Sequence, residues 1–143
     1  MIILQKLYDF NLPTEEMVNI YILFIRSMLE YSCVVWHSSI TEEESYSIER
    51  VQKTALRLIL RENYTYTSAM DFTGLSTLRE RRTQLSLTFA KKCLKNEKSR
   101  DLFPRKARVV NTREHEKYYV TPAHTERLAK SNVPFLQRLL NAN

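Results

Sequence analysis

The chain has 143 residues, of which 43% are hydrophobic and 27% are charged, which is enough for one globular domain with a real core. One glycine and four prolines are too few for the turns of a β-sandwich, so the composition favours an all-α fold. Residues 1–75 carry 6 basic and 10 acidic side chains, whereas residues 76–143 carry 16 basic and 6 acidic ones. This basic second half indicates either a polyanion-binding surface or, with equal weight on charge alone, a solvated helix face.

The first long helix is predicted at about 14–37, after a short helical segment that Pro13 ends. Its apolar residues recur at the helical period, so we expect it to lie in the core. The stretch is apolar enough to raise the question of a membrane span. However, it contains Arg26 and Glu30, and a charge at the bilayer centre costs about 3 kcal/mol. We therefore expect no membrane partner. The predicted buried face consists of Met17, Ile20, Tyr21, Phe24, Met28, Tyr31, Ser32 and Val35.

Two capping boxes predict the starts of the other long helices, at about 42–60 and 78–96. Thr41 is followed by Glu44, and Thr77 by Glu80, which is the spacing that satisfies the first backbone amides of a helix. A short helix at 67–72 ends before Gly74, a natural residue for a helix C-terminus. The three main helices and the short ones form a predicted bundle. Its expected core residues are Phe24, Met28, Val35, Trp36, Ile48, Val51, Ala55, Ile59, Leu85 and Phe89.

The helical period fails between 101 and 130, where we expect a basic irregular or extended segment, with a small hairpin around 113–116 as one arrangement. Ser131 is a good cap for a final helix with Pro134 in its first turn. The predicted organisation is therefore a helical bundle at 1–100, the basic segment at 101–130 and a C-terminal helix at 131–143, all within one domain.

No cluster of side chains predicts catalysis or a cofactor. Polymerase chemistry needs paired carboxylates for two metal ions, but the three aspartates, Asp9, Asp71 and Asp101, are isolated. Cys33 and His37 are half of a zinc site without a second pair, so a buried thiol and a helix-end histidine are the simpler interpretation. A single glycine excludes a P-loop and a nucleophile elbow. We expect no enzyme activity from this chain alone.

The compartment is predicted from cysteine usage and from the N-terminus. Cys33 and Cys93 lie 60 residues apart on predicted helices, which suits buried thiols in a reducing environment better than a disulfide. The first residues lack the basic region and cleavage site of a signal peptide. We expect an intracellular protein, nuclear or cytoplasmic, that is not secreted.

The cations of the second half are the candidate functional residues. Lys and Arg on a helix neutralise phosphates and release counterions, which gives sequence-independent, salt-sensitive binding to nucleic acid. Nearby tyrosines, Tyr64, Tyr66, Tyr118 and Tyr119, can stack on bases, although packing is their simpler role. The candidate nucleic-acid-binding residues are Arg81, Lys91, Lys92, Lys95, Lys98, Arg100, Arg105, Lys106 and Arg108.

An ordered series of segments resembles the region after the polymerase palm in the reverse transcriptases of jockey-type non-LTR retrotransposons. Two positions depart from the pattern, Ser27 where relatives commonly have proline and Leu140 where they often have tryptophan before asparagine. The segments that carry the resemblance are 25–37, 49–60, 74–82, 89–92, 101–104 and 134–141.

The resemblance implies a helical fragment that includes the thumb, a clamp on the template–primer duplex. The catalytic palm and its Mg²⁺ ions would lie outside this chain. RNA, DNA or an RNA–DNA hybrid, and the rest of a reverse transcriptase, are the implied partners. The alternative is a helical protein-interaction module, or a decaying transposon remnant, with no role in nucleic-acid binding.

Overall fold

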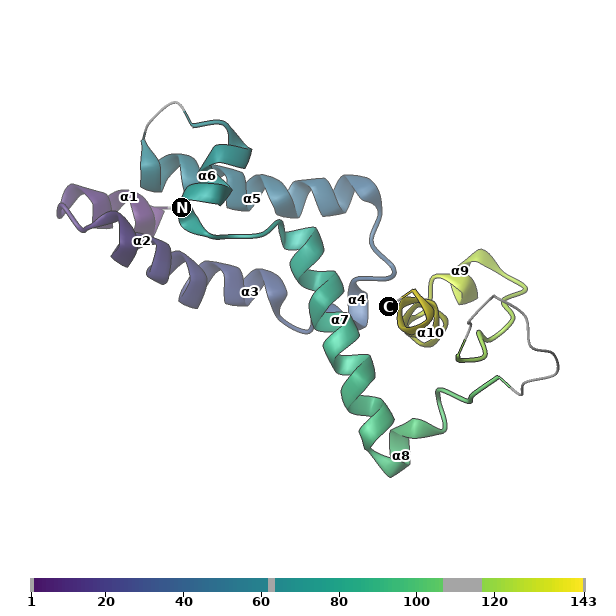
Figure 1. The fold of residues 1–143 in the computed structure, drawn as a ribbon. Coiled ribbons are helices and arrows are strands. Elements are labelled where there is room, and N and C mark those ends of the chain that lie inside the picture. The colour runs from purple at the N-terminus through teal and green to yellow at the C-terminus, as the bar shows by residue number, and fades with distance from the viewer. Residues whose placement is uncertain (1, 62–63, 107–116, 143) are drawn as a thin grey trace. The chain divides into compact units, whose positions relative to one another are not determined.

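The computed structural model describes residues 2–61, 64–106 and 117–142, and its fold is all-α, as the composition predicts (Figure 1). The chain divides into two compact units, which we describe separately. Unit 1 comprises Met1–Tyr31 and Thr41–Arg81, and unit 2 comprises Ser32–Ile40 and Arg82–Asn143. The helices are α1 (Ile2–Asp9), α2 (Thr14–Ile20), η1 (Tyr21–Arg26), α3 (Ser27–Glu30), α4 (Cys33–Trp36), α5 (Glu42–Leu60), α6 (Tyr66–Thr73), α7 (Leu78–Lys95), α8 (Glu97–Arg100), α9 (Glu126–Ala129) and α10 (Asn132–Asn141).

Unit 1 is built on α5, against which α1, α2 and α6 pack (Figure 1). The predicted capping box is confirmed, because the Glu44 amide donates to Thr41 Oγ1 at 3.2 Å and the Thr41 amide donates to Glu44 Oε2 at 2.8 Å. These bonds to Thr41 lower the pKa of the Glu44 carboxyl. The second predicted box is also confirmed at the start of α7, where the Glu80 amide donates to Thr77 Oγ1 at 3.1 Å.

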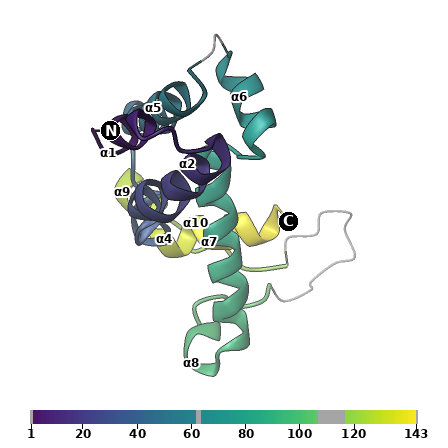
Figure 2. The same ribbon diagram turned by 90° about the vertical axis from the view of Figure 1, so that its left-hand side faces the viewer.

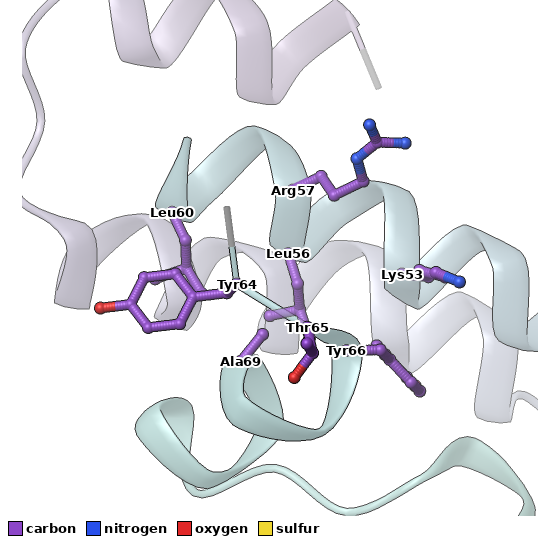
Figure 3. A pocket seen from close by; sticks show the side chains of 8 residues that line it. All are labelled: Lys53, Leu56, Arg57, Leu60, Tyr64, Thr65, Tyr66 and Ala69. Carbon is purple, nitrogen blue, oxygen red and sulfur yellow. The ribbon is translucent and has the colours of Figure 1, made fainter. Parts of the chain in front are cut away.

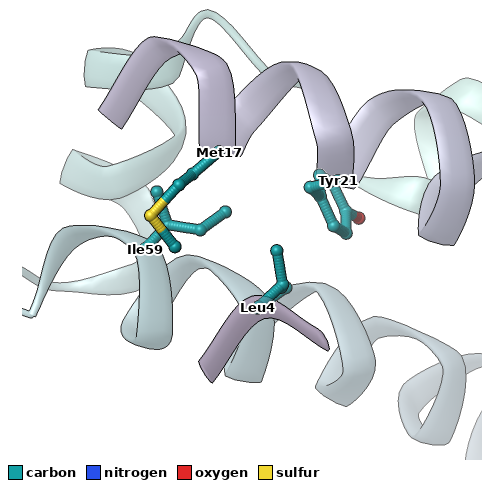
Figure 4. Close-up of a cluster of buried hydrophobic side chains, with 5 residues drawn as sticks. Leu4, Met17, Tyr21 and Ile59 are labelled. Carbon is teal, nitrogen blue, oxygen red and sulfur yellow. The ribbon is translucent and has the colours of Figure 1, made fainter. Parts of the chain in front are cut away.

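The apolar core of unit 1 lies between α1, α5 and the helical segment that begins at Thr14. Leu4, Met17, Tyr21 and Ile59 converge there and are almost fully buried (Figure 4). Ala55 completes this cluster, so Ala55 and Ile59 are core residues as predicted. Ile48 and Val51 are only half-buried, because the part of α5 that points into the core contains Gln52 instead.

Gln52 is fully buried and holds three elements of unit 1 together through hydrogen bonds. Tyr21 donates its hydroxyl to Gln52 Oε1 at 2.7 Å, and Gln52 Nε2 donates to the Tyr66 hydroxyl at 2.9 Å and to the Ser76 carbonyl at 3.0 Å. Tyr66 in turn donates to Glu49, which also accepts from the Leu78 amide at the start of α7. Burial raises the pKa of the Tyr21 hydroxyl, which remains a neutral donor.

The buried face predicted for residues 14–37 is correct only in its first part. Met17 is 1% exposed, whereas Phe24 is 66% and Met28 is 78% exposed. The physical reason is η1, a π-helical stretch that takes more residues per turn than an α-helix. It moves the buried stripe on by one residue, so that Ile25 packs towards the core and Phe24 does not.

The predicted 14–37 helix is also interrupted between α3 and α4. Tyr31 leaves the helical conformation, with φ of −56° and ψ of 124°, and Ser32 is left-handed with φ of 49°. Because a non-glycine residue rarely adopts positive φ, this is a true break rather than a bend. Val35, predicted to be core, is exposed, whereas Cys33 is buried.

Unit 2 is organised around the larger part of α7 and around α10, which packs against α4 and α9 (Figure 2). Ala90 and Cys93 of α7 form a cluster with Leu136 and Leu140 of α10, and Phe103 joins it. The predicted burial of both cysteines as free thiols is confirmed. The predicted core position of Phe89 is wrong, and Leu85 is only half-buried, because the α7 stripe that faces inward consists of Arg82, Ser86, Ala90 and Cys93.

The segment before α10 contains one isolated antiparallel bridge, between Arg105 and Tyr118, in the part of the chain that the structure describes. The predicted hairpin around 113–116 lies outside the described residues. Ser131 occupies the cap position of α10 as predicted, but its hydroxyl makes no capping bond to that helix; it donates to the Leu128 carbonyl at 2.7 Å instead.

Candidate nucleic-acid interface

Three lysines of α7 share one solvent-facing side of the helix. A helix turns by about 100° per residue, which places Lys91, Lys92 and Lys95 opposite the buried Ser86 and Ala90. All three are exposed, and none forms an ion pair within residues 2–61, 64–106 and 117–142. Lys91 and Lys95 are one turn apart, at the spacing of about 5–6 Å between side chains that suits successive phosphates.

The basic stretch continues through α8 into the chain that follows it. Asn96 caps α8 by accepting from the Lys98 amide at 3.0 Å, and Lys98 and Arg100 are exposed. Phe103, which is 3% exposed, then packs into the interior of unit 2. The exposed Arg105 and Lys106 follow it in the chain. Together with the three α7 lysines, seven of the nine predicted cations therefore face solvent in unit 2.

Two of the predicted residues do not join this surface. Arg81 belongs to unit 1, where its Nε lies 3.1 Å from Glu30 Oε1, and Glu30 also faces Arg26 at 3.5 Å. The Glu30 carboxylate therefore offsets much of the charge of Arg81. Arg108 lies outside the described residues.

Sequence reasoning missed Arg82, which is fully buried in unit 2. Its guanidinium lies 5.7 Å from the centre of the Trp36 ring, a cation–π geometry, and its Nε donates to His37 Nδ1 at 3.4 Å. His37 also packs edge-on against Phe135, with ring centres 5.4 Å apart. Arg81 and Arg82 are adjacent in the sequence, and nothing local indicates which of the two turns inward.

His37 is therefore part of the packing of unit 2, as is the buried Cys33 on the same short helix. Among the described residues, no three His, Cys, Asp or Glu side chains gather in an arrangement suited to a metal ion.

A separate cavity of about 450 Å³ lies in unit 1 between α5 and α6 (Figure 3). Leu56, Leu60 and Ala69 form its apolar part, and Tyr64 closes one end. The exposed Lys53 and Arg57 stand on α5 at its edge, but their side chains point away from the apolar part rather than converging on it (Figure 3). The arrangement is an apolar slot with basic neighbours.

The η1–α3 segment presents an apolar surface to solvent, formed by Leu23, Phe24, Met28 and Tyr31, all more than half exposed. We call it the η1–α3 face. The longer segment Thr14–Trp36, with a mean hydropathy of 1.4 in its most apolar window, is long and apolar enough to cross a membrane by length and composition. Only 11% of that window is buried, which differs from the core helix that the sequence predicts.

No family model, curated protein or solved structure matches this chain.

Proposed function

We propose that unit 2 binds the backbone of a nucleic-acid duplex or RNA–DNA hybrid without reading its sequence. The observation that carries the proposal is the solvent face of α7, where Lys91, Lys92 and Lys95 lie opposite a buried stripe and have no acidic partner in the described chain. Lys98, Arg100, Arg105 and Lys106 extend the same charge beyond the helix. Such cations bind phosphates through charge and counterion release rather than through base edges.

The resemblance to jockey-type non-LTR reverse transcriptases supports the same assignment. In that context the chain is the post-palm, thumb-side part of an RNA-directed DNA polymerase, and binding of template–primer nucleic acid is its contribution. The palm and its Mg²⁺ would supply the chemistry, so the isolated chain is proposed to bind without catalysing extension.

The test is the salt dependence of binding to a labelled RNA–DNA hybrid between about 50 and 200 mM salt, where phosphate contacts show most clearly. We expect a log–log slope of about −4, which corresponds to four or five neutralised phosphates. The triple variant Lys92→Glu, Lys95→Glu, Lys98→Glu removes three contacts and flattens the slope by roughly 3 units. All three side chains are exposed, so helicity stays unchanged.

A matched control reverses the same number of charges on another helix. Arg50, Lys53 and Arg57 are exposed on α5 in unit 1, so the variant with all three as glutamate has the same net charge as the first triple variant. The proposal expects this control to keep most of the salt slope. Equal losses in the two variants show a net-charge effect, and absence of binding at the low-salt end rejects the proposal.

The second candidate function is a protein-interaction module, and the η1–α3 face is the observation that favours it. Exposed apolar side chains on one helix face are typical of surfaces that bind other proteins. This function predicts no salt slope with nucleic acid. It also predicts self-association or partner binding that the Phe24→Ser, Met28→Ser variant abolishes, measured by sedimentation velocity.

A further inference from the structure

A cavity of about 610 Å³ opens in unit 2 beside α8, within the basic stretch. Phe103 is buried and Leu94 half-buried, so they form its apolar interior together with the half-buried ring of Tyr118. Arg100 and Arg105 line the same cavity and are exposed, which places them at its mouth. An apolar and aromatic interior with cations at the mouth fits a ligand that is flat at one end and anionic at the other.

Tyr118 is held in place by its backbone rather than by its hydroxyl. Its amide donates to Asn141 Oδ1 at 2.9 Å, and Asn141 Nδ2 donates back to the Tyr118 carbonyl at 2.9 Å. The next residue adds a bond from the Tyr119 amide to the Pro104 carbonyl at 2.9 Å. The ring packs against the unit 2 cluster and also lines the cavity, so it is a fixed aromatic platform.

The two arginines at the mouth have no ion pair within the described residues, although Asp101 lies in the same lining. Guanidinium groups bind phosphate through two parallel hydrogen bonds, which fixes orientation as well as supplying charge. Asp101 repels phosphate from its own edge and accepts hydrogen bonds from a sugar hydroxyl or a base amino group. The apolar interior of the cavity therefore suits a base, and the arginines at its mouth suit a phosphate.

We propose that this cavity takes one unpaired nucleotide of the bound strand, with its base against Tyr118 and its phosphate on Arg100 and Arg105. The inference rests on the proposed nucleic-acid function and refines its substrate class. The α7 lysines bind the backbone of a duplex, whereas the cavity binds an unpaired end or overhang. Base stacking on an aromatic side chain does not depend on sequence, which agrees with binding through the backbone.

The test compares three labelled probes with the same hybrid stem: a blunt end, a short single-stranded overhang, and the same overhang with abasic sites. The abasic probe keeps every phosphate and removes only the bases, so it isolates stacking. We expect the overhang probe to bind roughly 5- to 150-fold more tightly than the abasic one, the range that stacking of one base provides. Tyr118→Leu keeps the apolar packing and abolishes this difference, whereas Tyr118→Phe preserves it.

Arg105→Gln changes an exposed side chain, so this variant should fold as the wild type does. This variant should lower the affinity for the overhang and abasic probes more than the affinity for the blunt probe, because it removes a phosphate contact at the cavity. Equal affinities of the wild-type chain for overhang and abasic probes, or no effect of Tyr118→Leu, overturn the inference. If the blunt hybrid still binds with a steep salt slope in that case, the proposed function stands. If no probe binds at low salt, both fall.

Discussion

A polar network in unit 1 and the lysines of α7 in unit 2 show two different uses of charged and polar side chains. In unit 1, Gln52 is buried and fully bonded, and Glu30 holds Arg26 and Arg81, so charge and polarity maintain the fold. In unit 2, Lys91, Lys92 and Lys95 face solvent, and no ion pair to them is found in the described part of the chain. The net charge of a segment therefore says less about binding than which of its charges already have a structural partner.

The same contrast applies to apolar side chains. Unit 1 encloses Met17 and Tyr21 but leaves Phe24 and Met28 exposed to solvent, although all four lie on the helical segment that begins at Thr14. In unit 2, Phe103 and Leu136 are buried while the cavity beside them remains open. Among the described residues, each unit thus combines a closed core with apolar surface that the chain leaves uncovered. The following predictions compare buried with exposed positions.

The largest expected effect compares two methionines that the sequence places on one face. Met17→Ala removes a side chain that is 1% exposed, so it should lower the free energy of unfolding by about 2–5 kcal/mol. Met28→Ala removes one that is 78% exposed and should change it by less than about 0.5 kcal/mol. Urea denaturation of both variants measures the difference. Equal losses would contradict the shift of the buried stripe at η1.

Adjacent arginines give the next comparison, between a buried and a partly exposed guanidinium. Arg82→Ala leaves space against Trp36 and removes the bond to His37, so it should cost about 2–3 kcal/mol of stability. Arg81→Ala breaks a partly exposed ion pair and should cost at most about 1 kcal/mol.

Arg82→Met serves as the control for volume, since it keeps an apolar side chain of similar length in the buried site. If packing on Trp36 accounts for the role of Arg82, this variant should unfold close to the wild type in thermal and urea denaturation. A loss as large as that of Arg82→Ala would assign the effect to the guanidinium bonds instead.

Alkaline pH should weaken unit 1 through Tyr21. Unfolded tyrosine ionises with a pKa of about 10, whereas burial raises the pKa of Tyr21 in the folded chain. A raised folded pKa means that the contribution is complete below about pH 10 and is lost as the pH rises above it. The urea midpoint should therefore be lower at about pH 11 than at about pH 8, with the loss above about pH 10, and the loss should be smaller in Tyr21→Phe, which has no proton to lose at this position.

The smallest expected effect compares helix caps in the two units. Thr41→Ala removes the Oγ1 acceptor of the Glu44 amide but keeps the backbone amide that donates to Glu44 Oε2, and it should cost about 1 kcal/mol. Ser131→Ala should cost less, because the Ser131 hydroxyl makes no capping bond to α10. Thermal unfolding of the two variants in the same buffer measures which substitution lowers stability more. A larger loss of stability in Ser131→Ala would contradict the difference between the two caps.

Features that depend on near neighbours in the chain could be predicted from the sequence. Both capping boxes, the end of α6 at Gly74 with φ of 66°, and the lengths of α5 and α7 follow from residues within one or two turns of one another. The exposure of Lys91, Lys92 and Lys95 was also predictable, because the helical period separates them from any apolar face.

Which of several equivalent patterns is buried depends on contacts between distant parts of the chain. Periodicity assumes a regular α-helix, so it could not show that η1 shifts the stripe from Phe24 to Ile25. Nor does the pair Arg81 and Arg82 indicate that Arg82 turns inward, since this depends on Trp36 and His37, which lie some 45 residues away in the chain. Tyr118 became a fixed platform only through Asn141, 23 residues further on. Local signals define where helices begin and end, but distant contacts select the faces that stay exposed.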